Sequence, residues 1–230
     1  MGLKQLPAEF AQYTTHILWD YLNQFVAVYF NDIIMFSKDQ SEYTEHVWKV
    51  MSKLYNIGLS LNIDKYKFDV TKVEYLGLVF TPEGLKIPTE KVNAILDWLE
   101  PMNMKEVQGF LGITRYVRRF LEGYLKIAAP LTKLLRDDEP FVWKNEQQQA
   151  FYKLKELVKA ELIIQIHDPE KENVMKIDAS GDAHGLVLEQ SDNTGRLRPV
   201  AFYSRKFTSA EQNYDTHDRE LLAIVEGFRK

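Results

Sequence analysis

The sequence predicts an α+β fold in which a helical region separates two regions that contain β-strands. Three observations support this prediction. Residues 1–88 hold short β-branched and aromatic runs, residues 89–160 repeat apolar side chains at helical spacing, and residues 161–230 return to strand-like runs. Of the 230 residues, 45% are hydrophobic, which is enough for a substantial core. We therefore expect three structural regions with these boundaries.

A β-hairpin is predicted in the first region. The apolar run of residues 25–30 is followed by Asn31 and Asp32, and a second apolar run covers residues 33–36. Two strand-like runs separated by two turn-prone residues are typical of a tight hairpin. Asp32 is therefore expected in the turn, where a carboxylate can bind a metal ion, although Asn and Asp are also ordinary turn residues.

A helix and a further strand should complete the first region. The helix is expected to follow Ser41 and to end near Gly58, because apolar residues recur at Val47, Val50, Met51 and Leu54. Residues 73–80 have the character of a single strand. Residues 81–84 have the composition of a turn.

Three helices are predicted in the second region. Thr89 is placed to cap the first helix, and Asn103 with Glu106 resembles a capping box at the start of the second. The third helix carries an apolar stripe formed by Ala150, Phe151, Leu154, Leu157 and Val158. In the third region, strands are expected at residues 174–177, 186–188 and 200–203, with a turn at residues 192–195 and a closing helix that begins near Thr216.

Composition excludes several classes of protein. The formal net charge is −4, so the chain as a whole is no polycation, and it has no cysteine for disulfides or thiolate metal sites. No apolar run approaches the roughly 20 residues of a membrane span, and the N-terminus lacks a signal-peptide pattern. We expect an intracellular protein, located in the cytoplasm or the nucleus.

Positive charge is concentrated in residues 102–136, which contain seven basic and two acidic residues. The aromatic residues Tyr116, Phe120 and Tyr124 lie among them. This combination favours contact with nucleic-acid phosphates, and a solvated basic helix face explains it equally well. His167, His184 and His217 lack metal-ligand spacing and are expected on the surface or in loops.

Short motifs follow one another along almost the whole chain. They begin with Gly2-Leu3, Pro7-Ala8 and Phe10, continue with the hairpin sequence Tyr29-Phe30-Asn31-Asp32, and extend through residues 74–77, 82–84, 110–112, 116–120, 127–132, 141–143 and 149–151. This series resembles the reverse transcriptases of gypsy-class LTR retrotransposons. The resemblance implies an RNA-directed DNA polymerase, with the C-terminal part of the palm in residues 1–88 and the helical thumb and connection in residues 89–160.

The last region carries a second series of motifs, formed by residues 178–180, 204–206, 211–214 and 220–223. It is similar to the start of the RNase H domain that follows this polymerase. The resemblance implies a partial, mixed RNase H-like sheet with its first helix in residues 161–230. It further implies Mg²⁺ as the cofactor, held at the catalytic positions Asp32, Asp178 and Glu220. An RNA–DNA hybrid or another duplex is the implied partner, bound by Lys105, Arg115, Arg118, Arg119 and Lys126.

The departures from this family concern the metal ligands. Asn31 stands where the family has a catalytic aspartate, and another palm aspartate of the family would precede Met1. Two later RNase H aspartates would follow Lys230, together with the strand that pairs with the strand bearing Asp178. We therefore expect incomplete metal sites, no catalysis by this chain, and an exposed edge at that strand.

Three hypotheses about function remain. The chain is an excerpt of a working reverse transcriptase–RNase H, a non-catalytic remnant that binds duplex nucleic acid, or a derelict reading frame without selected function. Primer extension distinguishes the working enzyme from the other two hypotheses. Salt-dependent binding distinguishes the duplex-binding remnant from the derelict reading frame.

Overall fold

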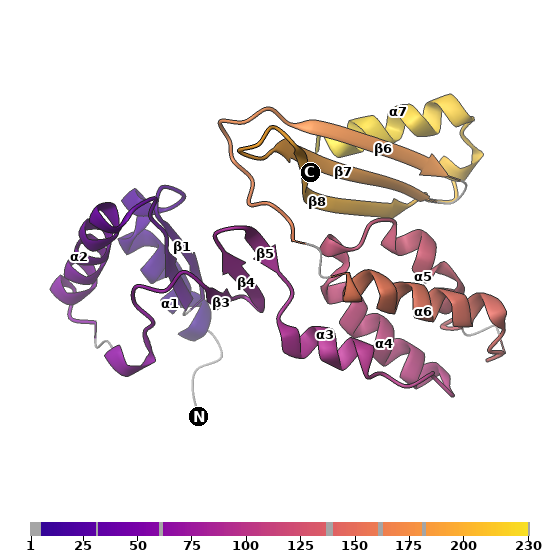
Figure 1. The fold of residues 1–230 in the computed structure, drawn as a ribbon, viewed down its shortest axis with the longest axis horizontal. Helices are drawn as coiled ribbons and strands as arrows, with labels where there is room; N and C mark the ends of the chain where they lie inside the picture. The colour runs from indigo at the N-terminus through magenta and orange to yellow at the C-terminus, as the bar shows by residue number, and fades with distance from the viewer. Residues whose placement is uncertain are drawn as a thin grey trace. The chain divides into compact units, whose positions relative to one another are not determined.

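The computed structural model describes residues 6–30, 32–59, 62–136, 140–160, 163–180 and 183–229. The chain divides into two compact units, Met1–Val70 and Thr71–Lys230. Helices and three small antiparallel sheets make up the fold, which confirms the predicted α+β class (Figure 1). Within the described ranges, no helix combines the length and the apolar character that crossing a membrane requires.

The first unit packs helices against one hairpin. Its helices are α1 (Leu6–Ile17), η1 (Trp19–Tyr21), α2 (Gln40–Asn56) and η2 (Ile63–Lys65), and the hairpin joins β1 (Val26–Tyr29) to β2 (Asp32–Met35). The core contains Leu18, Phe25, Val26, Val50 and Leu54, all buried. The predicted helix after Ser41 is confirmed as α2. Its cap is Asp39, whose carboxylate accepts hydrogen bonds from the backbone N–H groups of Ser41 and Glu42.

The hairpin forms as predicted, but with a different register. Tyr29 pairs with Asp32, so Asp32 is the first residue of β2 rather than a turn residue. This register also pairs Val26 with Met35 and Val28 with Ile33. The four apolar side chains then share the sheet face that packs into the core. Asn31 lies outside the described residues.

A three-stranded sheet opens the second unit, in the order β3 (Val73–Tyr75), β4 (Leu78–Thr81) and β5 (Gly84–Lys86). The single strand predicted over residues 73–80 is wrong, because the chain reverses at Leu76 and Gly77. Both residues have positive φ, 51° and 67°, as a two-residue hairpin turn of primed type requires. The turn predicted at residues 81–84 is confirmed between β4 and β5.

Four helices follow: α3 (Thr89–Leu96), α4 (Met104–Tyr116), α5 (Tyr124–Lys133) and α6 (Asn145–Lys159), with the short η3 (Arg118–Phe120) between α4 and α5. Thr89 is the first residue of α3 and makes no capping bond, so the predicted cap is wrong there. Asn103 does cap α4, since its side-chain oxygen accepts from the Glu106 N–H at 3.0 Å. The apolar stripes meet in one core that includes Phe110, Phe120, Leu131, Phe151 and Leu154.

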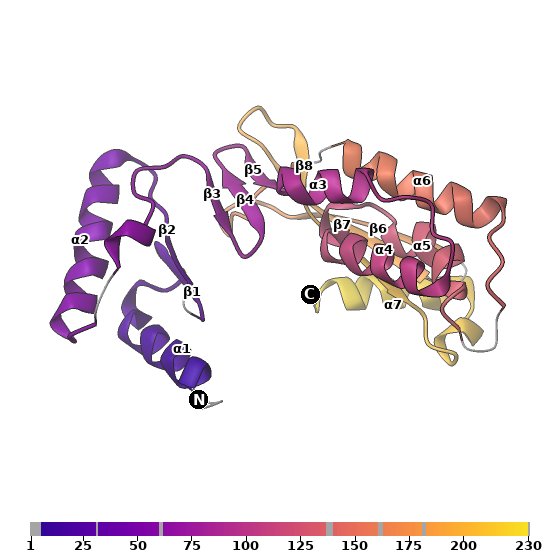
Figure 2. The same ribbon diagram turned by 90° about the horizontal axis from the view of Figure 1, so that it is seen from below.

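The second unit ends in a sheet of three long strands, β6 (Val174–Ser180), β7 (Ala183–Ser191) and β8 (Leu197–Lys206), followed by η4 (Glu211–Asn213) and α7 (Thr216–Gly227). The helix α7 lies along the β6 side of this sheet (Figures 1 and 2), and η3 and α5 pack against β8. The order β6-β7-β8 makes β6 an edge strand among the described residues, as predicted. A Cβ at Gly227 would lie 2.4 Å from Cδ1 of Leu186, so a side chain there would require the Leu186 side chain to move.

The prediction for His184 is wrong. This histidine is only 2% exposed on β7, where Tyr203 and Phe207 flank its ring, whereas His167 and His217 are exposed as predicted. An alternating strand places every second residue on the buried face, and position 184 falls on that face.

Candidate nucleic-acid interface and carboxylate positions

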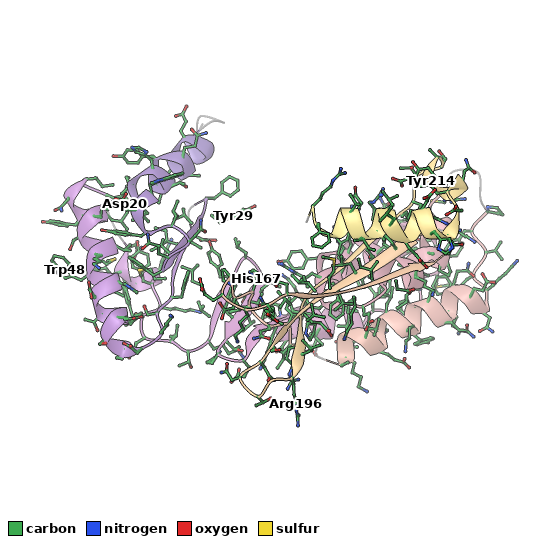
Figure 3. The ribbon with its side chains drawn as sticks, turned by 90° about the horizontal axis from the view of Figure 1, so that it is seen from above. Asp20, Tyr29, Trp48, His167, Arg196 and Tyr214 are labelled. Carbon is green, nitrogen blue, oxygen red and sulfur yellow. The ribbon has the colours of Figure 1, made fainter. Side chains whose placement is uncertain are left out.

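The hairpin of the first unit presents Asp32 to solvent. The residue before the turn on β1, Tyr29, is 51% exposed and its ring extends away from the strand (Figure 3). Tyr29 and Phe30 meet edge to face, with ring centroids 4.8 Å apart. Rigid pairing of β1 with β2 therefore fixes the backbone of Asp32 beside two exposed aromatic rings.

The other two predicted carboxylates belong to the second unit. Asp178 lies on β6 opposite Gly185, and Glu220 lies in the first half of α7, which packs against β6. Both side chains are exposed. The fold thus brings the elements that carry Asp178 and Glu220 together, whereas Asp32 belongs to the other unit.

These carboxylates do not by themselves fit a two-metal site. Among the residues described, no three His, Asp or Glu side chains come close enough to hold one metal ion. Mg²⁺ is held through several oxygen ligands, and a pair of ions depends on shared carboxylates. Asn31, which replaces a carboxylate of the family pattern, offers an amide oxygen without charge. We derive no catalytic step through a metal from these residues.

One face of α4 carries two basic side chains and a glycine and has no carboxylate. Lys105 near its start and Arg115 near its end, both predicted, are about 15 Å apart along the axis. Gln108 and Gly112 lie between them, within about 80° around the same helix. All four residues are exposed, and apart from the neighbouring backbone of α4 itself, no atom of the described residues lies within 4 Å of the position that a Cβ of Gly112 would take.

Gln108 and Gly112 were not predicted as site residues. Their signal is the spacing of three or four residues from Lys105 and Arg115, which places all four on one helix face. Charge alone does not reveal them, because both residues are neutral.

The remaining predicted basic residues lie away from this face. Arg118 and Arg119 belong to η3, which packs against β8, and Lys126 lies on α5. All are exposed, and none of the seven basic residues between positions 102 and 136 forms an ion pair within the described chain. Their charges therefore remain available to an anionic partner.

Tyr124 lies beneath these arginines. Burial raises the pKa of its phenol, while a hydrogen bond with Thr114 at 3.1 Å and the charges of Arg115 and Arg118 oppose that rise. The buried tyrosine thus connects the C-terminal end of α4 to the start of α5. It fixes the backbone that carries Arg115.

Comparison with known proteins assigns the two ends of the chain separately. Residues 1–80 match the family described as reverse transcriptase (RNA-dependent DNA polymerase). Residues 143–230 match the RNase H-like domain found in reverse transcriptase. The two matches follow one another in the order that the motifs predict.

Relatives match almost the entire chain. The Transposon Tf2-3 polyprotein of Schizosaccharomyces pombe is 32% identical over 228 residues, which are 99% of this chain and 17% of the relative. The Pol polyprotein from transposon 297 of Drosophila melanogaster is 38% identical over 225 residues, which are 97% of this chain and 21% of the relative. The chain thus spans about a fifth of each relative's length.

Solved structures share the fold. A foamy viral protease-reverse transcriptase in complex with dsDNA is 23% identical, with a TM-score of 0.83, covering 100% of this chain and 48% of that chain. The same viral protein in complex with an RNA/DNA hybrid has a TM-score of 0.80 at 23% identity, covering 96% of this chain and 30% of that chain. The family expected from the motifs is confirmed, and the chain belongs to the reverse transcriptase–RNase H part of gypsy-type LTR-retrotransposon Pol polyproteins.

Proposed function

We propose that this chain binds an RNA–DNA hybrid or another nucleic-acid duplex through the face of α4 that carries Lys105, Gln108, Gly112 and Arg115. The observation that carries the proposal is the combination of Lys105 and Arg115, which form no ion pair with any described residue, with Gly112, which has no side chain, between them. Lysine and arginine bind backbone phosphates, and a helix face without a side chain lets a groove approach closely. The viral relatives of this fold are seen with dsDNA and with an RNA/DNA hybrid, which supports the same choice of partner.

Arg118, Arg119 and Lys126 extend the positive charge beyond this face. We assign them a supporting part, because long-range attraction of a polyanion depends on summed charge rather than on one contact. An intracellular location is part of the proposal, since the family copies nucleic acid and the chain has no cysteine.

Salt dependence of binding tests the proposal. The full chain is titrated onto a fluorescently labelled RNA–DNA hybrid at several salt concentrations, and affinity is followed by anisotropy. Each phosphate contact contributes about one to the slope of log affinity against log salt. Lys105→Ala should lower that slope by about one. Lys159→Ala, which removes the same charge at the exposed end of α6, should leave it unchanged.

The proposal fails if the two lysine variants behave alike or if binding does not respond to salt. Absence of binding excludes the duplex-binding remnant, and together with absent primer extension it leaves a reading frame without selected function as the remaining hypothesis. Binding that only Lys105→Ala weakens identifies the α4 face as the contact surface.

We further propose that this chain does not polymerise DNA. Reverse transcriptases and RNases H generally use Mg²⁺, and Asn31 removes one carboxylate from the hairpin that carries Asp32. Primer extension with Mg²⁺ should therefore give no product above background with the unaltered chain. Extension by the unaltered chain would contradict this part of the proposal and favour the enzymatic hypothesis.

A further inference from the structure

A cavity of about 280 Å³ lies between η3 and the last sheet of the second unit. Arg118 and Arg119 line one side. The opposite walls come from all three strands and from the end of α7, with Met175, Leu186, Leu188, Ala201, Phe202, Tyr203, Ser204 and Gly227. The face of α4 described above contributes no residue to it. The cavity is therefore a separate feature of the molecule.

The two arginines give the cavity a positive entrance. Both are exposed and neither forms an ion pair within the described chain. A guanidinium group offers a rigid fork of N–H donors that matches the oxygens of a phosphate. Two arginines that line one cavity, without acidic partners among the described residues, therefore favour an anion with several oxygens.

The rest of the cavity is mainly apolar. Leu186 and Leu188 of β7 face the same side of the sheet as Met175 of β6, because Met175 pairs with Leu188. Ala201 and Tyr203 of β8 lie on the same face, because Ala201 pairs with Leu188 and Tyr203 pairs with Leu186. An anion alone gains nothing from these walls, so the ligand that uses the whole cavity joins a phosphate to a flat apolar group.

We infer that this cavity binds a single nucleoside 5′-monophosphate group, with the phosphate on Arg118 and Arg119 and the base against Met175, Leu186 and Leu188. A volume just below the range of drug-sized pockets leaves room for about one nucleotide. The group belongs either to the 5′-phosphorylated end of a strand or to a free nucleotide. The inference rests on the proposed function, since a nucleic-acid-binding chain meets such ends.

Two short oligonucleotides of the same sequence, one with a 5′-phosphate and one with a 5′-hydroxyl, test the inference by anisotropy with the full chain. The phosphorylated strand should bind roughly tenfold more tightly, as expected for loss of one charge-assisted contact. Arg118→Ala with Arg119→Ala should abolish this preference. Equal binding of the two strands by the unaltered chain overturns the inference.

Variants separate this cavity from the α4 face. Gly112→Leu, on the face proposed for duplexes, should keep the preference for the phosphorylated strand, whereas Ala201→Leu should fill the cavity and remove the preference. Because Ala201→Leu risks overpacking, its circular dichroism and melting temperature are measured first. If it does not fold, the double arginine variant, which changes only exposed side chains, decides alone.

Competition experiments show whether the 5′-monophosphate group comes from a strand end or from a free nucleotide, and whether the base contributes to binding. Adenosine 5′-monophosphate should displace the phosphorylated strand at lower concentration than inorganic phosphate does. If inorganic phosphate competes equally well, the apolar walls contribute nothing and the inference is wrong. If the free nucleotide competes as strongly as the phosphorylated oligonucleotide, the cavity is a nucleotide site. If the free nucleotide competes more weakly, the cavity is a site for strand ends.

Discussion

The helical part and the last sheet of the second unit bury different kinds of side chain. Between α3 and α6 the interior consists of apolar residues such as Phe110, Phe120 and Phe151, with few buried polar groups. The sheet β6–β8 buries His184 and Gln190 on one strand and holds an arginine between two glutamates at its end. The first interior depends on shape, whereas the second depends on whether each polar group finds a partner.

The sheet β6–β8 contains a buried polar side chain with hydrogen-bond partners and one without. The Gln190 side chain is fully buried, and it donates to the carbonyl of Asp168 at 2.8 Å and accepts from its N–H at 2.9 Å. Six residues earlier, His184 is buried with no hydrogen-bond partner on either ring nitrogen in the described structure. Burial alone therefore does not tell whether a polar residue stabilises this sheet.

The largest expected effect lies in the helical core. Phe110→Ala should lower the free energy of unfolding by about 3–5 kcal/mol, because it removes a buried ring that packs against Phe151 at 4.6 Å. Chemical denaturation measures the change. Phe228→Ala, which removes the same atoms from a side chain that is 79% exposed, should cost far less. Similar losses in the two variants would show that the helical core is not the stabilising centre.

Replacing Gln190, the buried glutamine with hydrogen-bond partners, should cause the next largest loss of stability. Gln190→Leu should lower the free energy of unfolding by about 1–3 kcal/mol, since it leaves the Asp168 N–H without its partner and removes one of the two donors to the Asp168 carbonyl, the other being the Lys171 N–H. Thermal unfolding and hydrogen exchange at Asp168 measure the loss. An unchanged melting temperature would contradict the importance of these bonds.

The unpaired histidine should respond in the opposite direction. His184→Leu should raise the free energy of unfolding by about 1 kcal/mol, because an apolar side chain replaces a buried polar ring without partners. Burial, and then the nearby Arg205, lower the pKa of His184. At pH values below the ordinary histidine pKa of about 6.5, the unfolded chain therefore binds a proton at His184 more readily than the folded chain does.

The gain from His184→Leu should accordingly grow as the pH falls below that value. Melting temperatures of both proteins across neutral to mildly acidic pH test this. A gain that stays constant with pH, or a loss of stability, would contradict the assignment of His184 as a buried neutral ring.

The ion pair at the end of the sheet has the smallest expected effect. Arg205 donates two hydrogen bonds to Glu211, each 3.0 Å long, and this pairing lowers the pKa of Glu211 to about 2. A lowered carboxyl pKa stabilises the folded state above the ordinary value near 4.5, and that stability is lost as the pH falls toward 2. Glu211→Gln should flatten the stability–pH curve in this window. A curve unchanged by the variant would contradict the role of the pair.

The difference between the two interiors also explains what could be predicted from the sequence. Apolar spacing located α2, α4, α6 and α7, because helical cores follow a local period. The pattern could not reveal the turn at Leu76 and Gly77, since leucine rarely adopts positive φ and only pairing of β3 with β4 requires it there. It also could not show that His184 points inward, because that depends on the register of three strands.

The candidate site residues also divide into those that the sequence identifies and those that only the structure identifies. Asp32, Asp178 and Glu220 were found by motif, and the described residues do not join them into one metal set. Lys105 and Arg115 were found by charge, whereas the face that they share with Gln108 and Gly112 became evident only once α4 had defined bounds. Geometry thus adds the neutral residues of a surface, which composition does not distinguish.

The most direct test of the proposed α4 surface compares affinity for the RNA–DNA hybrid across the unaltered chain, Gly112→Ala and Gly112→Leu. Alanine and leucine favour a helix over glycine by up to about 1 kcal/mol, so both variants should be at least as stable as the unaltered chain. Affinity should nevertheless fall as the side chain grows, because it projects into the duplex. Unchanged affinity in Gly112→Leu would contradict the assignment of this face as the binding surface.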